Sequence, residues 1–139
     1  MIVLDTNIVS EVMRMRPEPA VLAWLDAQDT GQLFLTSVSV AEILYGIARM
    51  PEGRRKHQLF EMAEGMFDED FSGRLLAFDG HAAVYYAELV AQRDAAGRPI
   101  GMADAQIAAI CRCCDATLAT RNTRDFEALG ILLINPFGT

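Results

Sequence analysis

The chain has 139 residues, of which 52% are hydrophobic and 22% charged, and its formal net charge is −7. This length and composition predict a single globular domain spanning residues 1–139 and exclude an intrinsically disordered chain. The acidic balance argues against a protein that wraps duplex nucleic acid with a broad basic surface. It leaves open a nuclease whose acidic residues hold cations.

The sequence also indicates where the protein works. No apolar run reaches the roughly 20 residues that a membrane-spanning helix needs, and no basic, signal-like segment begins the chain. The three cysteines, Cys111, Cys113 and Cys114, crowd into one helix-like segment, CRCC. This spacing is more typical of reduced thiols than of a disulfide framework or a zinc site, so we expect a cytoplasmic protein with no membrane association.

Apolar periodicity and turn residues divide the chain into alternating strands and helices. Short, wholly apolar runs predict strands, and apolar residues at helical spacing predict helices. In chain order, the expected elements are a strand at 2–4, helices at 7–13 and 20–27, a strand at 33–36, helices at 37–49 and 57–67, a strand at 75–78, helices at 81–93 and 101–114, a strand at 116–119, a short helix within 120–129 and a strand at 131–134.

This alternation predicts an α/β fold with a central, mostly parallel sheet of four to five short strands. Strands that are apolar throughout are buried on both faces, so we expect helices on both sides of the sheet. In such sheets, ligands bind beyond the carboxyl ends of the strands. The residues at these ends are therefore the first candidates for a functional site.

Four acidic residues fall at or near expected helix starts or just past expected strands. Asp5 directly follows the first strand, Glu42 lies one turn into the helix after the second, Asp104 opens a helix after the loop GRPIG, and Asp125 lies just past the fourth strand. Each has a structural explanation when taken alone. These explanations are an N-cap at Asp5, a capping box of Ser39 with Glu42, a favourable helix dipole at Asp104 and a small turn containing Asp125.

Taken together, the acids favour a metal site. Four carboxylates at one sheet edge repel one another unless they are protonated or share a cation. The apolar sequence neighbours of Glu42 and Asp104 predict that these two side chains are poorly solvated. Magnesium is the expected ion, with manganese as a substitute, because both prefer oxygen ligands. Such an ion polarises a phosphoryl oxygen and lowers the pKa of a bound water, which suits hydrolysis of a phosphodiester.

Two groups of basic residues are candidates for contact with a nucleic acid. Arg121 and Arg124 flank the proposed site within TRNTRD, where they could bind substrate phosphates or instead pair with Asp125 or Glu127. The run RRKH at 54–57 could follow an RNA backbone, although such a run is more often solvated.

Four blocks of the sequence resemble the PIN-domain ribonucleases, and specifically the VapC-type (FitB-like) toxins of bacterial type II toxin–antitoxin modules. These blocks are MIVLDTNIVSE, SVSVAEILYGI, RPIGMADAQIAA and LATRNTRDFEALGILLINPF, and together they span nearly the whole chain in order. The resemblance implies a three-layer α/β/α domain and a magnesium-dependent endoribonuclease. It also implies a homodimer and a cognate antitoxin that neutralises the enzyme in a heterotetramer or larger complex.

The resemblance also implies roles for individual residues. Asp5, Glu42, Asp104 and Asp125 would form the acidic catalytic pocket, with Asp5 and Asp104 as the direct metal ligands. A final group of polar residues would support this pocket: Thr6, Asn7, Thr120 and Asn122.

Other classes of protein fit the sequence less well. A signalling receiver would need a late lysine, but the single Lys56 is misplaced, and a phosphatase with a D-x-D motif would need an acid where Asn7 stands. A catalytically silent PIN-like RNA-binding module remains the main alternative, and the complete acidic set argues against it.

Overall fold

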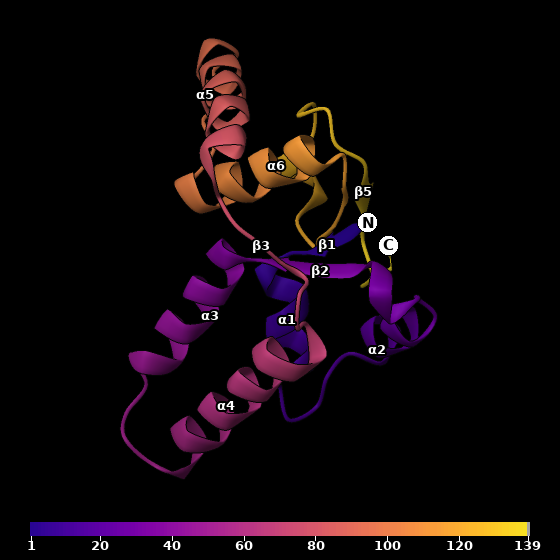
Figure 1. The fold of residues 1–139 in the computed structure, drawn as a ribbon, viewed down its shortest axis with the longest axis vertical. Helices are drawn as coiled ribbons and strands as arrows, with labels where there is room; N and C mark the ends of the chain where they lie inside the picture. Colours follow the sequence, from indigo (N-terminus) through magenta and orange to yellow (C-terminus); the bar gives the residue numbers. More distant parts are fainter. Residues whose placement is uncertain (139) are drawn as a thin grey trace.

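The structure is a computed structural model that describes residues 1–138. The sheet strands are β1 (Ile2–Leu4), β2 (Leu33–Thr36), β3 (Leu75–Leu76), β4 (Thr117–Ala119) and β5 (Leu133–Ile134). The α-helices are α1 (Thr6–Val12), α2 (Pro19–Asp26), α3 (Ser37–Ala48), α4 (Arg54–Gly65), α5 (Gly80–Ala95) and α6 (Met102–Cys114). Shorter helical segments are η1 (Thr30–Gln32), η2 (Met66–Asp70) and η3 (Thr123–Phe126). Figure 1 shows their arrangement.

The five strands form one sheet in the order β3-β2-β1-β4-β5, and every neighbouring pair is parallel. From β1 the chain first adds β2 and β3 on one side of the sheet, and later adds β4 and β5 on the other. The connections that leave β1 and β4 therefore diverge, and the carboxyl ends of these two strands form the topological switch point where α/β proteins bind ligands. Asp5 and Thr120 are the residues that follow β1 and β4 at this point.

Helices cover both faces of the sheet. Successive residues of a strand point to opposite faces, and in β1 Leu4 packs into one core while Val3 packs into the other. The first core lies under α1, α2, α3 and α4, and the second lies under α5, α6 and η3. Figure 1 shows α5 and α6 on one side of the strands and α1, α3 and α4 on the other. The predicted three-layer α/β/α architecture is confirmed.

Several element boundaries differ from the expected ones. β3 and β5 are two-residue strands, shorter than predicted, because each pairs at only two positions with its neighbour at an edge of the sheet. Helix α3 is capped by Thr36, whose side chain accepts a hydrogen bond from Ser39 N at 3.1 Å. The expected capping box of Ser39 with Glu42 is therefore wrong, since Ser39 already lies inside the helix.

The basic run at 54–57 forms the start of α4 instead of preceding it. Arg55 donates a hydrogen bond to the carbonyl of Met13 at 3.3 Å, and Lys56 donates to the carbonyl of Ala48 at 3.0 Å. These carbonyls lie at the carboxyl ends of α1 and α3, where a cation is favourable against the helix dipole. Two of the basic side chains in this run thus stabilise helix ends.

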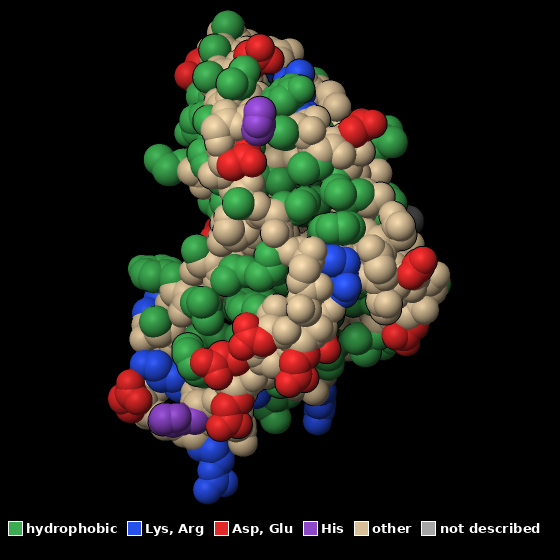
Figure 2. Space-filling view, viewed as in Figure 1, with side chains coloured by type: hydrophobic (Ala, Val, Ile, Leu, Met, Phe, Trp, Pro, Cys, Tyr) green, Lys and Arg blue, Asp and Glu red, His purple; other side chains and the backbone are tan. Residues whose placement is uncertain are grey.

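The surface reflects the acidic composition. Figure 2 shows acidic and basic side chains scattered over this face, without a continuous basic area. Within residues 1–138, no helix is both long and apolar enough to cross a membrane.

Candidate active site

Asp5 lies at the carboxyl end of β1 and is almost fully buried, at 4% exposure. It is also the N-cap of α1, and its Oδ1 accepts a hydrogen bond from Thr6 N at 2.8 Å. Its Oδ2 accepts hydrogen bonds from the Thr120 hydroxyl at 2.8 Å and from Asn7 Nδ2 at 3.2 Å. Asp5 can therefore be both the N-cap of α1 and a residue of the acidic site, because a carboxylate has lone pairs beyond those that a cap uses.

Burial changes the pKa of Asp5. Loss of solvation raises the pKa of this carboxyl above its ordinary value, and the negative charge of Glu42 adds to the increase. The hydrogen bonds from Thr120, Thr6 and Asn7 act in the opposite direction. They stabilise the charged form and hold the side chain in one orientation.

Thr120 joins the ends of β1 and β4. It is fully buried, and besides donating to Asp5 its hydroxyl oxygen accepts hydrogen bonds from Asn122 N at 3.0 Å and Asn7 Nδ2 at 3.4 Å. The side-chain oxygen of Asn7 accepts from Arg121 N at 3.2 Å. Of the predicted supporting residues, Asn7 and Thr120 thus act through their side chains. Asn122 contributes its backbone N–H.

Thr6 connects this centre to α3. Its hydroxyl donates to Glu42 Oε1 at 2.6 Å and lies 2.9 Å from the hydroxyl of buried Ser39. The prediction that apolar neighbours desolvate Glu42 is wrong, because its side chain is exposed. Helical periodicity explains the difference: Ile43 and Ile47 turn into the core, and Glu42 falls on the open side of α3.

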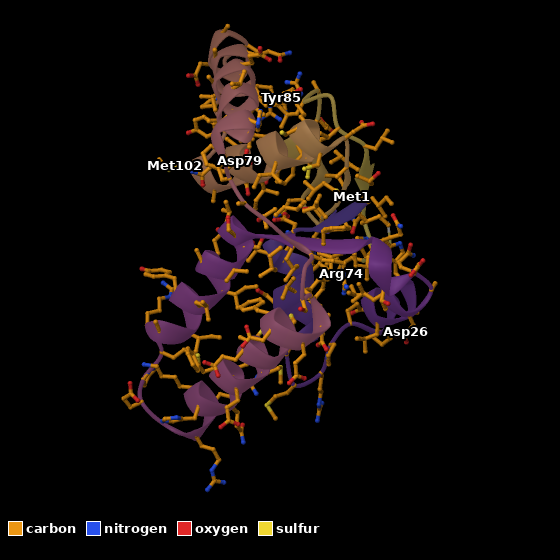
Figure 3. All side chains as sticks on the ribbon, viewed as in Figure 1. Met1, Asp26, Arg74, Asp79, Tyr85 and Met102 are labelled. Atoms are coloured by element: carbon orange, nitrogen blue, oxygen red, sulfur yellow. The ribbon has the colours of Figure 1, made fainter. Side chains whose placement is uncertain are left out.

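Asp104 lies in the first turn of α6 and is half-buried. Its pKa is raised from 3.8 to about 6, chiefly by burial and then by the negative charges of Asp5, Glu42 and Asp125, in that order. The four predicted acids therefore interact electrostatically at one edge of the sheet. Met102, the first residue of α6, marks this end of the helix in Figure 3, where it lies above the beginning of α3.

Asp125 is carried by η3 and is exposed. The backbone of this segment is held by Arg93 of α5, whose guanidinium donates to the carbonyl of Asp125 at 2.8 Å and to that of Glu127 at 2.9 Å. Phe126 anchors the segment from the other side, with 1% of its surface exposed. Two contacts thus fix the position from which Asp125 faces the site.

Arg93 was not among the residues predicted from the sequence. Its side chain is 6% exposed, which is unusual for arginine, and Nε has no hydrogen-bond partner among the described residues. A signal was present in the sequence: Arg93 lies 4 residues after Leu89 and 11 after Ala82, so it falls on the buried face of α5. A cation on the inner face of an amphipathic helix is a sign that it serves as a structural contact.

The two predicted basic contacts differ in their surroundings. Arg121 stacks over the ring of Phe137, with 4.6 Å between its guanidinium carbon and the ring centroid. Neither Arg121 nor Arg124 pairs with Asp125 or Glu127, so that alternative is wrong, and the salt-bridge partner of the Glu127 carboxylate is Arg98, at 3.9 Å. Arg121 is instead held by the aromatic ring, and Arg124 is exposed.

The donor set suits a hard divalent cation. Within residues 1–138, none of the four acids forms a salt bridge with a lysine or arginine, and all their ligand atoms are carboxylate oxygens. The charges of Asp5, Glu42 and Asp125 all act on Asp104, although in the described part of the chain no three acids, histidines or cysteines stand close enough to form a ready-made metal-binding group. Carboxylate oxygens are the ligands that magnesium and manganese prefer, and Asp5 Oδ2 is held in place by hydrogen bonds from Thr120 and Asn7.

A parallel sheet with acids at its switch point defines a class of α/β proteins with carboxylate-lined sites suited to phosphodiester chemistry. Residues 2–132 match the PIN domain, so this chain belongs to the PIN-domain family. A VapC ribonuclease of Sinorhizobium fredii, Y4jK, is 44% identical to it over 99% of this chain and 98% of its own. The toxin FitB of Neisseria gonorrhoeae is 37% identical over 99% of each chain.

A solved structure shares the fold. The crystal structure of FitAcB from Neisseria gonorrhoeae aligns with a TM-score of 0.93 and 37% identity, and it covers 100% of both chains. The family that the sequence blocks predicted is thereby confirmed.

Proposed function

We propose that this protein is a magnesium-dependent endoribonuclease and the toxin of a type II toxin–antitoxin module. The observation that carries the proposal is the set of four mutually repelling carboxylates around Asp5 and Asp104, at the switch point of a parallel sheet. Similarity to a VapC ribonuclease and to the toxin FitB supports the choice of RNA as substrate and of a toxin as the class.

In this proposal, Asp5 and Asp104 bind the cation. When bound, the ion supplies Lewis acidity toward a phosphoryl oxygen and lowers the pKa of a water. Thr120 and Asn7 orient the Asp5 carboxylate through the hydrogen bonds to Oδ2. Residues that support metal ligands in this way commonly affect activity as much as affinity.

Glu42 and Asp125 complete the site from its open side. Both are exposed, so in this proposal each can accept a hydrogen bond from the attacking water and orient it. Thr6 holds Glu42 Oε1 by its 2.6 Å hydrogen bond, and Arg93 holds the backbone of Asp125. We propose that manganese can replace magnesium, since the ligands are the same oxygens.

The proposal includes partners. A cognate antitoxin would neutralise the enzyme, in a heterotetramer or larger complex built on a homodimer of this chain. The similarity to FitB and to the FitAcB structure supports such a partner. An enzyme of this kind works where its RNA is found, in the cytoplasm.

The main competing function is an RNA-binding PIN-like module without catalysis. Four unpaired carboxylates disfavour it, because they repel phosphates in the absence of a cation. The test is incubation of a labelled, structured RNA pool with the antitoxin-free protein, in magnesium and in EDTA. Cleavage in magnesium alone supports the ribonuclease, and binding without cleavage in either condition supports the silent module.

A further inference from the structure

A cavity of about 410 Å³ adjoins the acidic site on the side of α6 and η3. Asp104 and Asp125 line one part of it. The rest of its lining comes from the segment that joins α5 to α6, from η3 and from the end of α5. These residues are Arg93, Arg98, Pro99, Ile100, Gly101 and Arg124. Its volume falls in the range of roughly 300–1,000 Å³ that is typical of ligand pockets.

The three arginines of this cavity are in different states. Arg93 is buried, and its guanidinium already donates hydrogen bonds to the carbonyls of Asp125 and Glu127. Arg98 is about half exposed, donates to the carbonyl of Arg124 at 3.3 Å and lies 3.9 Å from a carboxylate oxygen of Glu127. Arg124 is exposed, and within residues 1–138 its guanidinium has no hydrogen-bond or salt-bridge partner. Arg98 and Arg124 thus keep donor groups available.

The start of α6 adds to the positive potential of the cavity. Gly101 is the N-cap of this 13-residue helix, and no side chain caps it. The first backbone N–H groups of a helix are unsatisfied within the helix and carry a partial positive charge. Gly101, at this helix end, lines the cavity together with Arg98, so the helix end and the arginines favour the same kind of ligand.

We propose that this cavity is a subsite for a backbone phosphate of the RNA, next to the phosphate that is cleaved. The proposal rests on the ribonuclease function above and extends it to substrate positioning. Arg124 and Arg98 would bind the phosphate through charge-assisted hydrogen bonds, for which the guanidinium fork is well suited. Asp104 and Asp125 repel an anion, so the bound phosphate lies at the arginine end of the cavity.

This division of charge has a consequence for the substrate. A strand whose cleaved phosphate is bound at the acids with a cation, and whose neighbouring phosphate is bound at the arginines, has its path across the site fixed at two points. The overall charge of −7 makes such a local basic subsite more important, since the rest of the surface repels RNA.

The test uses the salt dependence of RNA binding. The probe is a fluorescein-labelled single-stranded RNA of mixed sequence, bound to the full chain carrying Asp5→Asn to suppress cleavage. For single strands, each phosphate contact adds about 0.7 to the slope of log K against log salt concentration. The double variant Arg98→Gln/Arg124→Gln should therefore reduce the slope by about 0.7, because both arginines are proposed to bind the same single phosphate.

Arg16→Gln is the matched control, because Arg16 is an exposed arginine between α1 and α2, outside the cavity and outside both groups of candidate RNA contacts. It should leave the slope unchanged. Equal slopes in the double variant and in the Arg16→Gln control would overturn the subsite, and so would a parent protein that does not bind this RNA. Urea unfolding of each variant verifies that the compared proteins are folded.

Cleavage of the same RNA by the wild-type chain in magnesium separates the two proposals. A wild-type protein that cuts RNA while the double variant keeps the full salt slope would overturn the subsite alone. A reduced slope with no cleavage by the wild type would support the subsite and count against the ribonuclease.

Discussion

The hydroxyl of Thr120 donates a 2.8 Å hydrogen bond to the carboxylate of Asp5, and this contact joins two strand ends that are 115 residues apart in the chain. Both side chains are buried. The contact lies at the switch point between β1 and β4, where the sheet places its ligand-binding edge. It therefore orients the proposed metal ligand from a rigid part of the fold.

Thr120→Val tests this contact, because valine keeps the shape and removes the hydroxyl. We expect a loss of about 1–3 kcal/mol in the free energy of unfolding, since a buried acceptor of Asp5 loses a donor. Cleavage should fall by about 10–100-fold, as for other residues that support a metal ligand. Urea unfolding and single-turnover cleavage measure the two effects. Thr117→Val, at the start of β4, is the control, and equal cleavage by both variants would contradict the role of Thr120.

Asp104→Asn should stabilise the metal-free protein at neutral pH. The pKa of Asp104 is raised to about 6 in the folded state, so the folded protein holds this proton more tightly than the unfolded chain, whose carboxyl titrates near 3.8. The free energy of unfolding should therefore rise as the pH falls through about 6 toward 3.8. The asparagine variant removes this contribution, and with it part of the pH dependence.

The free energy of unfolding is measured by urea titration in EDTA, at neutral pH and at a pH between 3.8 and about 6, the two pKa values of Asp104. Asp94→Asn replaces an exposed carboxylate of α5 and serves as the control. If Asp104→Asn and Asp94→Asn showed the same change of stability with pH, the proposed repulsion among the four acids would be wrong.

Magnesium should raise the melting temperature of the wild-type protein. A ligand that binds only the folded state stabilises it by about 2.7 kcal/mol when present at about 100 times its Kd. Asp104→Asn removes a proposed ligand, so its melting temperature should rise much less at the same magnesium concentration. Differential scanning fluorimetry with and without magnesium tests this, and equal shifts for the two proteins would exclude Asp104 as a ligand.

Arg93→Met tests whether the buried arginine positions Asp125. The substitution keeps much of the aliphatic stem and removes the hydrogen bonds to the carbonyls of Asp125 and Glu127. Hydrogen bonds from a charged group contribute about 1.5–3 kcal/mol each, so we expect a clear loss of stability. Cleavage per folded molecule should also fall, through kcat more than KM. Arg54→Met is the control, and unchanged kcat in folded Arg93→Met would assign Arg93 to stability alone.

Much of the fold could be predicted because its strands are short apolar runs. The residues Ile2–Leu4 and Leu33–Thr36 form strands with the predicted bounds, since a run buried on both faces has a clear sequence signature. The edge strands were harder to delimit. Leu132 is apolar but 75% exposed, so hydrophobicity alone could not show where β5 begins.

The acidic residues of the candidate site could be predicted from the sequence more easily than the residues that hold them in position. Asp5 follows from the rule that ligands bind at strand ends, whereas Asp104 was predicted from its place in the block RPIGMADAQIAA. The exposure of Glu42 follows from the helical spacing of Ile43 and Ile47, which turn into the core, whereas the cap at Thr36 depends on where β2 ends and α3 begins. Arg93 is 32 residues before Asp125, so only the tertiary packing of α5 against η3 brings them together.

The central claim is that Asp5 holds a cation for RNA cleavage. The most direct measurement is single-turnover cleavage of a labelled RNA by the antitoxin-free protein in magnesium, compared with Asp5→Asn and with wild type in EDTA. Asparagine has nearly the same shape, and near-ultraviolet circular dichroism verifies the fold. We predict cleavage by the wild type in magnesium and none in the other two reactions. Cleavage by Asp5→Asn at the wild-type rate would contradict the claim and leave Asp5 as the cap of α1.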